Sequence, residues 1–102
     1  MARIRAIVKR WDEEYGHMTN ISCTLKNLQN IVDGYIETVT VVDDLVIICN
    51  EEGWIRDLPF NCSICGHQFF GDLIFIGVDG EDFADIPISF KDYKRIFFGG
   101  GS

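Results

Sequence analysis

The sequence lacks the motifs that mark the common enzyme classes. It has no P-loop, no dinucleotide-binding fingerprint, no GxSxG nucleophile elbow, and no HExxH or HxE metal motif. It contains only two histidines, which leaves few side chains for general acid–base chemistry. We therefore expect a protein that is not an enzyme.

Long apolar segments are also missing. No run approaches the ~20 apolar residues that a helix needs to cross a bilayer. Met1 to Arg5 carry charge, but no apolar core of signal-peptide length follows them. These absences predict a cytoplasmic protein with no membrane association. In the cytosol disulfides are rare and thiolate–metal sites are common, although the four cysteines would form two bridges in a secreted protein.

Positive charge is scarce as well. Nine Lys and Arg stand against 16 Asp and Glu, for a formal net charge of −7. Such a surface repels phosphate backbones, so we expect no direct binding of duplex nucleic acid and a better fit to a basic protein. The carboxylates fall in predicted turns, where they serve either as plain solvated groups or as a partner-binding surface. The candidate partner-binding residues are Asp12, Glu13, Glu14, Asp43, Asp44, Glu51, Glu52, Asp79, Glu81 and Asp82.

The length suits one domain with a substantial core and is too short for two. We expect a single domain over residues 1–98, with residues 99–102 as an appended linker. The pattern of alternating apolar residues and turns predicts an α+β fold in the order ββαβββα. Its mostly antiparallel sheet has about five strands and packs with two helices. Leu45 to Cys49 reads as a central strand, and Trp54 to Leu58 is expected to pair back on it.

Two helices carry clear end signals. Thr24 is the predicted N-cap of the first, and Asp33-Gly34 ends it, because glycine tolerates a left-handed cap. Ser89 is the predicted N-cap of the second, with Asp92 three residues on as in a capping box. Both helices are short, and the sheet is expected to supply most of the core.

The segment Cys62-Ser63-Ile64-Cys65-Gly66-His67 is the one candidate for metal chemistry. Two thiols and an imidazole at this spacing match the ligand types that zinc takes in structural sites. We predict a structural zinc ion on Cys62, Cys65 and His67, and the plainer alternative is a loop with free thiols. The fourth ligand is expected to be Cys23, with His17 second, and Cys49 is also left open.

A second binding chemistry is compatible with the sequence. Arg3, Arg5, Lys9 and Arg56 would line a positive pocket if they shared one sheet face, although a solvated outer face is the more common outcome. With Trp54 or Phe83 nearby, such a pocket would bind a phosphorylated nucleotide by stacking and charge.

Several short motifs resemble a family of small uncharacterised proteins from phages and mobile elements of Gram-positive bacteria. They are Leu28-Gln29, Gly34-Tyr35-Ile36-Glu37, Asn50-Glu51-Glu52-Gly53, Leu58-Pro59-Phe60-Asn61 and Gly71-Asp72. Where relatives carry a basic residue after the asparagine, this chain has the Cys62–His67 segment.

The resemblance implies a phage-derived protein that works in the cytosol of a bacterial host. By analogy with acidic, metal-containing anti-CRISPR proteins, it implies an anti-defence inhibitor that binds a Cas nuclease or a similar defence effector. The alternatives are a sponge that sequesters a nucleotide immune signal and an accessory protein of a mobile element.

Overall fold

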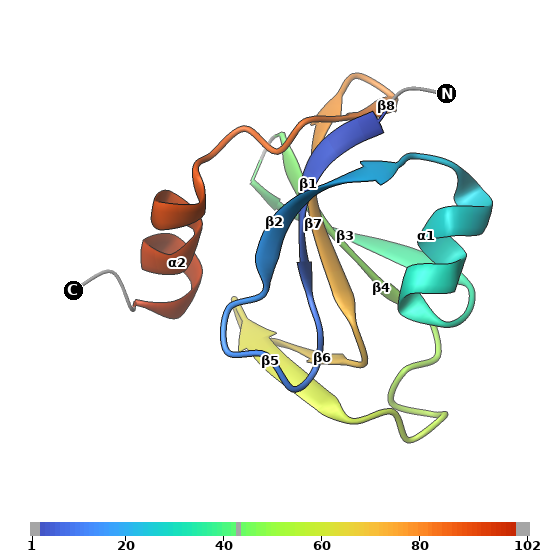
Figure 1. Cartoon of the computed structure of the whole chain (residues 1–102). Coiled ribbons are helices and arrows are strands. Elements are labelled where there is room, and N and C mark those ends of the chain that lie inside the picture. Colours follow the sequence, from blue (N-terminus) through green and yellow to red (C-terminus); the bar gives the residue numbers. More distant parts are fainter. Residues whose placement is uncertain (1–2, 43, 100–102) are drawn as a thin grey trace.

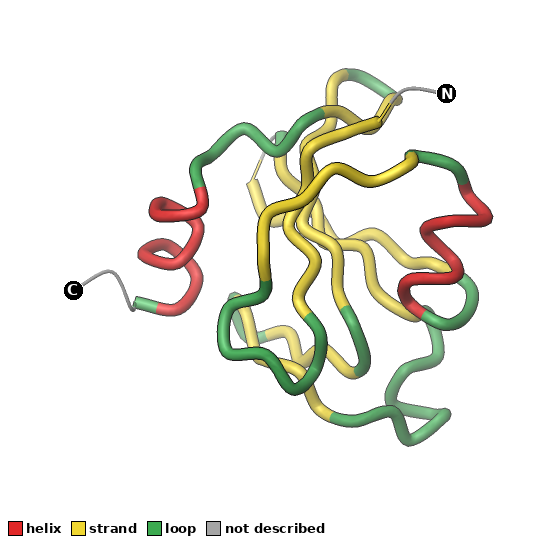
Figure 2. The backbone as a smooth tube through the Cα atoms, viewed as in Figure 1, coloured by secondary structure: helices red, strands yellow, loops and turns green. Residues whose placement is uncertain are grey.

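The computed structural model describes residues 3–42 and 44–99. Figure 1 labels its elements, and Figure 2 shows strands, helices and loops along the backbone. In chain order they are β1 (Arg3–Lys9), β2 (His17–Ser22), α1 (Leu25–Val32), β3 (Ile36–Val42), β4 (Leu45–Asn50), β5 (Phe60–Ile64), β6 (His67–Phe70), β7 (Leu73–Asp79), β8 (Asp82–Ala84) and α2 (Phe90–Phe98).

A six-stranded antiparallel sheet forms the centre of the molecule. Its strand order is β2-β1-β7-β4-β3, with β8 paired to β7. All six residues of β4 are buried, which confirms the central strand predicted from the apolar run. The α+β class, the mostly antiparallel sheet and the two helices are therefore confirmed. The strand count is higher than predicted, because β8 and the β5–β6 pair are added.

The two faces of the sheet carry separate cores. On the α1 face, residues such as Ala6, Ile48 and Ile74 pack against Leu28 and Val32 of the helix. The opposite face is covered by α2 and by the β5–β6 hairpin (Figure 1). Its core includes Ile7, Ile47 and Phe75 from the sheet, Tyr93 from α2, and Cys62, Ile64 and Phe69 from the hairpin.

Both helices begin at the predicted residues. The Thr24 hydroxyl accepts a hydrogen bond from the Asn27 N–H at 3.1 Å, and the Ser89 hydroxyl accepts one from the Asp92 N–H at 3.1 Å. At the end of α1 the left-handed residue is Asp33, with φ of 62°, and Gly34 follows with φ of 156°. A Cβ at Gly34 would lie 2.6 Å from Asn50 Nδ2, so close packing adds to the demand for glycine there.

The predicted strand over Trp54 to Leu58 is wrong. This segment is a series of turns, in which the Arg56 N–H donates to the Glu52 carbonyl at 2.8 Å and the Leu58 N–H donates to the Gly53 carbonyl at 2.9 Å. The Arg56 guanidinium also donates to the Asp33 carbonyl at the end of α1. These local turn bonds and the distant contact with Asp33 override the strand preference of Trp54 and Ile55.

The Cys62–His67 segment is a β-hairpin and not an irregular loop. Cys65 and Gly66 connect β5 to β6 with φ of 52° and 78°, the two positive values that a two-residue type I′ turn requires. Ile64 pairs with His67 across the hairpin, and Cys62 pairs with Phe69. Alternation along the strand therefore sends Cys62 and Ile64 into the core while Ser63 faces solvent.

Candidate functional site

The predicted zinc ligands fall at different depths and on different faces. Cys62 is buried in the core beneath the hairpin, whereas Cys65 and His67 are exposed at its turn. Cys23 packs against the core on the α1 face, so the sheet separates it from Cys62. Across residues 3–42 and 44–99, no group of three or more His, Cys, Asp or Glu side chains is placed to hold one metal ion. The structure thus does not bring the four predicted ligands together.

The two alternative zinc ligands, His17 and Cys49, lie on other strands than the hairpin. The His17 ring nitrogen Nδ1 lies 3.4 Å from Glu13 Oε2, at the turn between β1 and β2. Cys49 is buried in β4, and it lines a hollow of about 310 Å³ together with His67. Burial raises the pKa of the Cys49 thiol to about 11 and also raises that of Cys62, because desolvation favours the neutral thiol. Zinc on this segment stays a prediction from the sequence.

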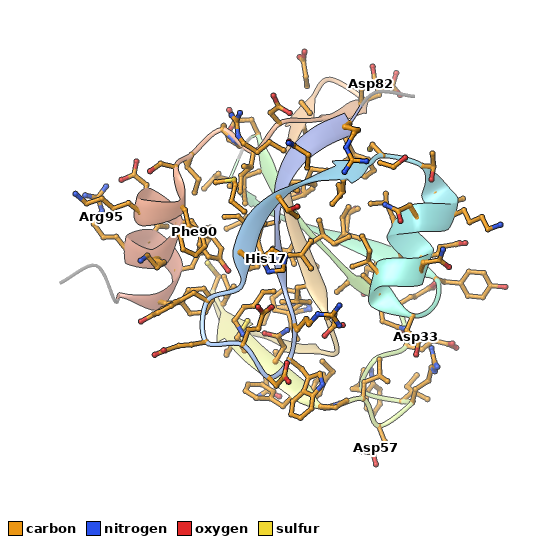
Figure 3. The ribbon with its side chains drawn as sticks, in the orientation of Figure 1. His17, Asp33, Asp57, Asp82, Phe90 and Arg95 are labelled. Carbon is orange, nitrogen blue, oxygen red and sulfur yellow. The ribbon has the colours of Figure 1, made fainter. Side chains whose placement is uncertain are left out.

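The predicted acidic residues divide between opposite ends of the sheet. Asp12 and Glu14 lie on the β1–β2 turn, and Glu51 and Glu52 follow the end of β4. The antiparallel register places this end away from the β3–β4 and β7–β8 turns, which carry Asp44, Asp79, Glu81 and Asp82. Figure 3 shows Asp33 and Asp57 at the first end and Asp82 at the other. Asp43 lies outside the described residues.

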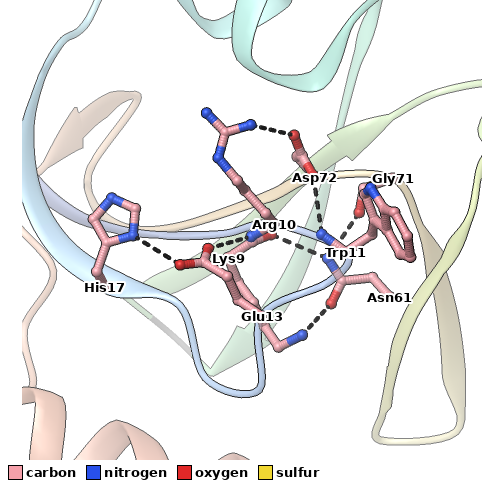
Figure 4. Close-up of polar contacts among 8 residues, drawn as sticks. All are labelled: Lys9, Arg10, Trp11, Glu13, His17, Asn61, Gly71 and Asp72. Carbon is pink, nitrogen blue, oxygen red and sulfur yellow. Dashed lines mark hydrogen bonds and ion pairs between the residues drawn. The ribbon is translucent and has the colours of Figure 1, made fainter.

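Glu13 has a structural role within its turn. Its carboxylate accepts a hydrogen bond from the Arg10 N–H at 2.9 Å and faces the His17 ring (Figure 4). The hydrogen bond from Arg10 is the main reason that the pKa of Glu13 lies below its usual range. Glu13 therefore shapes the turn that presents its neighbours Asp12 and Glu14.

Exposed aromatic side chains accompany the carboxylates at the first end. Trp11 is 50% exposed, Trp54 70% and Phe60 51%. The Trp11 N–H donates to Asp72 Oδ1 at 3.0 Å, two residues after Phe70, the last residue of β6, against which Phe60 packs. Trp54 lines a hollow together with the same Phe70. We call this surface the aromatic–acidic end, and it consists of Trp11, Asp12, Glu14, Glu51, Glu52, Trp54 and Phe60. The sequence pointed to the four carboxylates and to Trp54, but not to Phe60, which is the first residue of β5.

A buried lysine, Lys9, lies beneath the aromatic–acidic end. Lys9 is 2% exposed, and its ammonium donates to Asn61 Oδ1 at 2.6 Å (Figure 4). Asn61 Nδ2 in turn donates to the carbonyls of Lys9 and Gly71 at 3.0 and 2.8 Å. Burial lowers the pKa of Lys9. The expectation that Lys9 lies on a solvated outer face is therefore wrong, because the hairpin and α2 cover that face.

The residues of the predicted positive pocket are dispersed. Arg56 lines a hollow of about 420 Å³ at the end of α1, with Tyr35, two amides and the carboxylates of Asp33 and Glu52. Arg3 and Arg5 lie at the opposite end of β1, and Phe83 packs against the core on the α1 face. The structure thus keeps Arg56 as a binding candidate and separates it from Arg3, Arg5, Lys9 and Phe83.

Comparisons with known proteins show the family and not an activity. Neither a curated protein nor a solved structure matches the chain. No helix within the described ranges has the length and apolarity to cross a membrane. One family model matches residues 4–97, nearly the whole described domain. The chain therefore belongs to the family described as a domain of unknown function, DUF3846.

Proposed function

We propose that this chain is a non-enzymatic binding protein whose aromatic–acidic end docks onto a basic face of a protein partner. The observation that carries the proposal is the exposure of Trp11 and Trp54 among carboxylates. Within the described part of the chain, Asp12, Glu14, Glu51 and Glu52 form no ion pair, so their charge is available to a partner.

The two kinds of side chain have complementary effects on binding. Tryptophan and phenylalanine bury a large apolar area at little cost in conformational entropy, and aromatic residues are enriched among binding hot spots. Carboxylates at the rim attract a basic surface and orient it during approach. Affinity therefore depends on the aromatics, and the association rate and its salt dependence depend on the carboxylates.

The partner we propose is a bacterial defence effector, with a Cas nuclease as the first candidate. The acidic surface supports this choice, because such nucleases hold nucleic acid in positively charged channels. The resemblance to phage proteins supports it as well. A zinc ion on the Cys62–His67 segment, if bound, would fix the hairpin beside this surface and take no part in any reaction.

A binding survey with matched charge reversals tests this function. Purified defence nucleases are screened against the chain at about 50 mM and about 300 mM salt, and affinity is expected to fall at the higher concentration. The variant Glu51→Lys/Glu52→Lys is expected to lose about tenfold or more in affinity. The control Asp79→Lys/Glu81→Lys changes the charge equally at the other end and is expected to have a much smaller effect. The proposal fails if no nuclease binds at low salt or if both variants behave alike.

The hollow around Arg56 supports a second candidate function. Tyr35 is exposed beside it, and Gln29 and Asn30 add hydrogen-bonding amides, so a nucleotide has groups for stacking, charge and base recognition. A phosphate would have to displace Asp33, whose carboxylate lies 3.5 Å from the Arg56 guanidinium. A thermal-shift screen with cyclic nucleotides and ADP-ribose derivatives tests this function, since tight binding must raise the melting temperature. An accessory protein of a mobile element would respond in neither assay.

A further inference from the structure

Strand β3 forms an open edge of the sheet. The order β2-β1-β7-β4-β3 ends there, and within the described residues β3 pairs with β4 alone. Its sequence, Ile-Glu-Thr-Val-Thr-Val-Val, is β-branched except at Glu37 and contains no lysine or proline. Natural proteins often protect an edge with those residues, with a covering segment or with a bulge. Of these devices β3 has a register irregularity, and it lies at the far end between Thr40 and Val42.

The register identifies the backbone groups that face outward. The Glu51 N–H donates to the Tyr35 carbonyl at 2.9 Å, so Tyr35 and Glu51 form a hydrogen-bonded pair. Such pairs alternate along an antiparallel ladder, so Glu37 and Val39 bond to β4. The backbone groups of Thr38 and Thr40 therefore point away from the sheet. On the other edge, by contrast, the Arg3 side chain already donates to the Asn20 carbonyl of β2 at 2.8 Å.

A negatively charged hollow lies beside the start of this edge. Its volume is about 310 Å³, and Glu37, Glu51, Trp54 and His67 line it together with residues of β4 and β6. No lysine or arginine is among its lining residues in the described chain. Two carboxylates and an indole ring suit the ammonium of lysine or the guanidinium of arginine. The edge and the hollow share Glu37, whose backbone belongs to β3.

We propose that β3 is a docking edge for an extended basic segment of the partner. The segment adds a strand beside Thr38 and Thr40, and one of its lysine or arginine side chains enters the hollow between Glu37 and Glu51. This inference rests on the proposed function and specifies how the basic partner is held. A second copy of the chain fits less well, because it brings its own net charge of −7 to the same edge.

Amide hydrogen exchange on the ¹⁵N-labelled full chain tests the inference. The probe is an extended peptide of alternating lysine and threonine, and a peptide of alternating glutamate and threonine is the control. The basic peptide is expected to slow exchange at the Thr38 and Thr40 amides by about tenfold or more and to leave Val39, already bonded to β4, nearly unchanged. Glu37→Lys is expected to abolish the effect, whereas Glu81→Lys, an equal charge change on the β7–β8 turn, is expected to retain most of it.

Thr38→Pro gives an independent variant, because it removes an outward N–H and proline is tolerated on edge strands. The melting curve of Thr38→Pro shows whether this variant folds. If it does not fold, the Glu37→Lys result alone tests the docking edge. The inference is overturned if the basic peptide leaves Thr38 and Thr40 unchanged at millimolar concentration. It is also overturned if both amides are protected in the free protein in a concentration-dependent way, which would identify a second copy as the occupant. A nuclease that binds without protecting these amides would refute the docking edge and leave the proposed function intact.

Discussion

Among the described residues, the buried ammonium of Lys9 pairs with no carboxylate and donates to the side-chain oxygen of Asn61 at 2.6 Å. The same amide group donates to the backbone carbonyls of Lys9 and Gly71, so Asn61 joins the end of β1 to the hairpin and to the start of β7. One side chain thereby fixes the position of the β1–β2 turn, which carries Trp11, relative to the start of β5, where Phe60 lies.

Replacement of Asn61 is expected to destabilise the protein strongly. Asn61→Ala leaves a buried ammonium without its acceptor and two carbonyls without a donor, which costs about 2–4 kcal/mol in the free energy of unfolding. Urea denaturation measures the loss, and Gln68→Ala on the exposed face of the same hairpin is the control. Lys9→Met is expected to cost less than Asn61→Ala, because the buried charge leaves with its partner. A loss below about 0.5 kcal/mol for Asn61→Ala would contradict this role.

Two cysteine variants separate core packing from a zinc staple. The side chain of Cys62 lies in the core and that of Cys65 lies in solvent. Packing alone predicts that Cys62→Ala costs about 1–2 kcal/mol and that Cys65→Ala costs little. A zinc staple on this segment predicts comparable losses at Cys62, Cys65 and His67. Melting curves with and without a chelator, together with metal analysis of the purified chain, decide between the two outcomes.

Alkaline pH is expected to weaken the fold through Cys49. Burial, with a smaller contribution from Glu37, raises the pKa of its thiol from 9.0 to about 11. Between these values the unfolded thiol loses its proton while the folded one keeps it, so stability falls as pH rises above about 9 and levels off above about 11. The loss amounts to at most about 2–3 kcal/mol. Urea denaturation from pH 8 upward measures it. Cys49→Ala should reduce the slope over this window without removing it, because burial also raises the pKa of Cys62 and of Tyr93; an unchanged slope would refute the assignment.

The sequence predicted those elements that depend on residues close to one another in the chain. The Thr24 and Ser89 caps and the apolar run of β4 lie where the sequence placed them, because each depends on residues within a few positions. The turns over 54–58 could not be recognised in the same way, since Arg56 bonds to Asp33 across the fold. The buried position of Lys9 was equally hidden, because α2 and the hairpin cover it from distant parts of the chain.

The hairpin, by contrast, had a local signal that the cysteines obscured. Phe60, Cys62 and Ile64 alternate with polar residues, and Gly66 occupies the second position of a two-residue turn. The spacing of Cys62, Cys65 and His67 also matches that of a zinc site, so the same residues supported a second interpretation. Most of the described acidic residues lie in turns as predicted, but Asp79 and Asp82 are the strand residues that flank the β7–β8 turn. Their division between two ends depends on the sheet register and required the structure.

The affinity of Trp54→Ala for a Cas nuclease that retains the natural chain tests the central claim most directly. Trp54 is the most exposed large apolar side chain of the described residues, and Leu25→Ala at the start of α1, toward the opposite end, is the matched control. If the aromatic–acidic end is the docking surface, Trp54→Ala weakens binding by about tenfold or more while Leu25→Ala leaves the affinity and both melting temperatures nearly unchanged. Full affinity in Trp54→Ala, with a loss in Leu25→Ala, would place the contact at the other end and contradict the account.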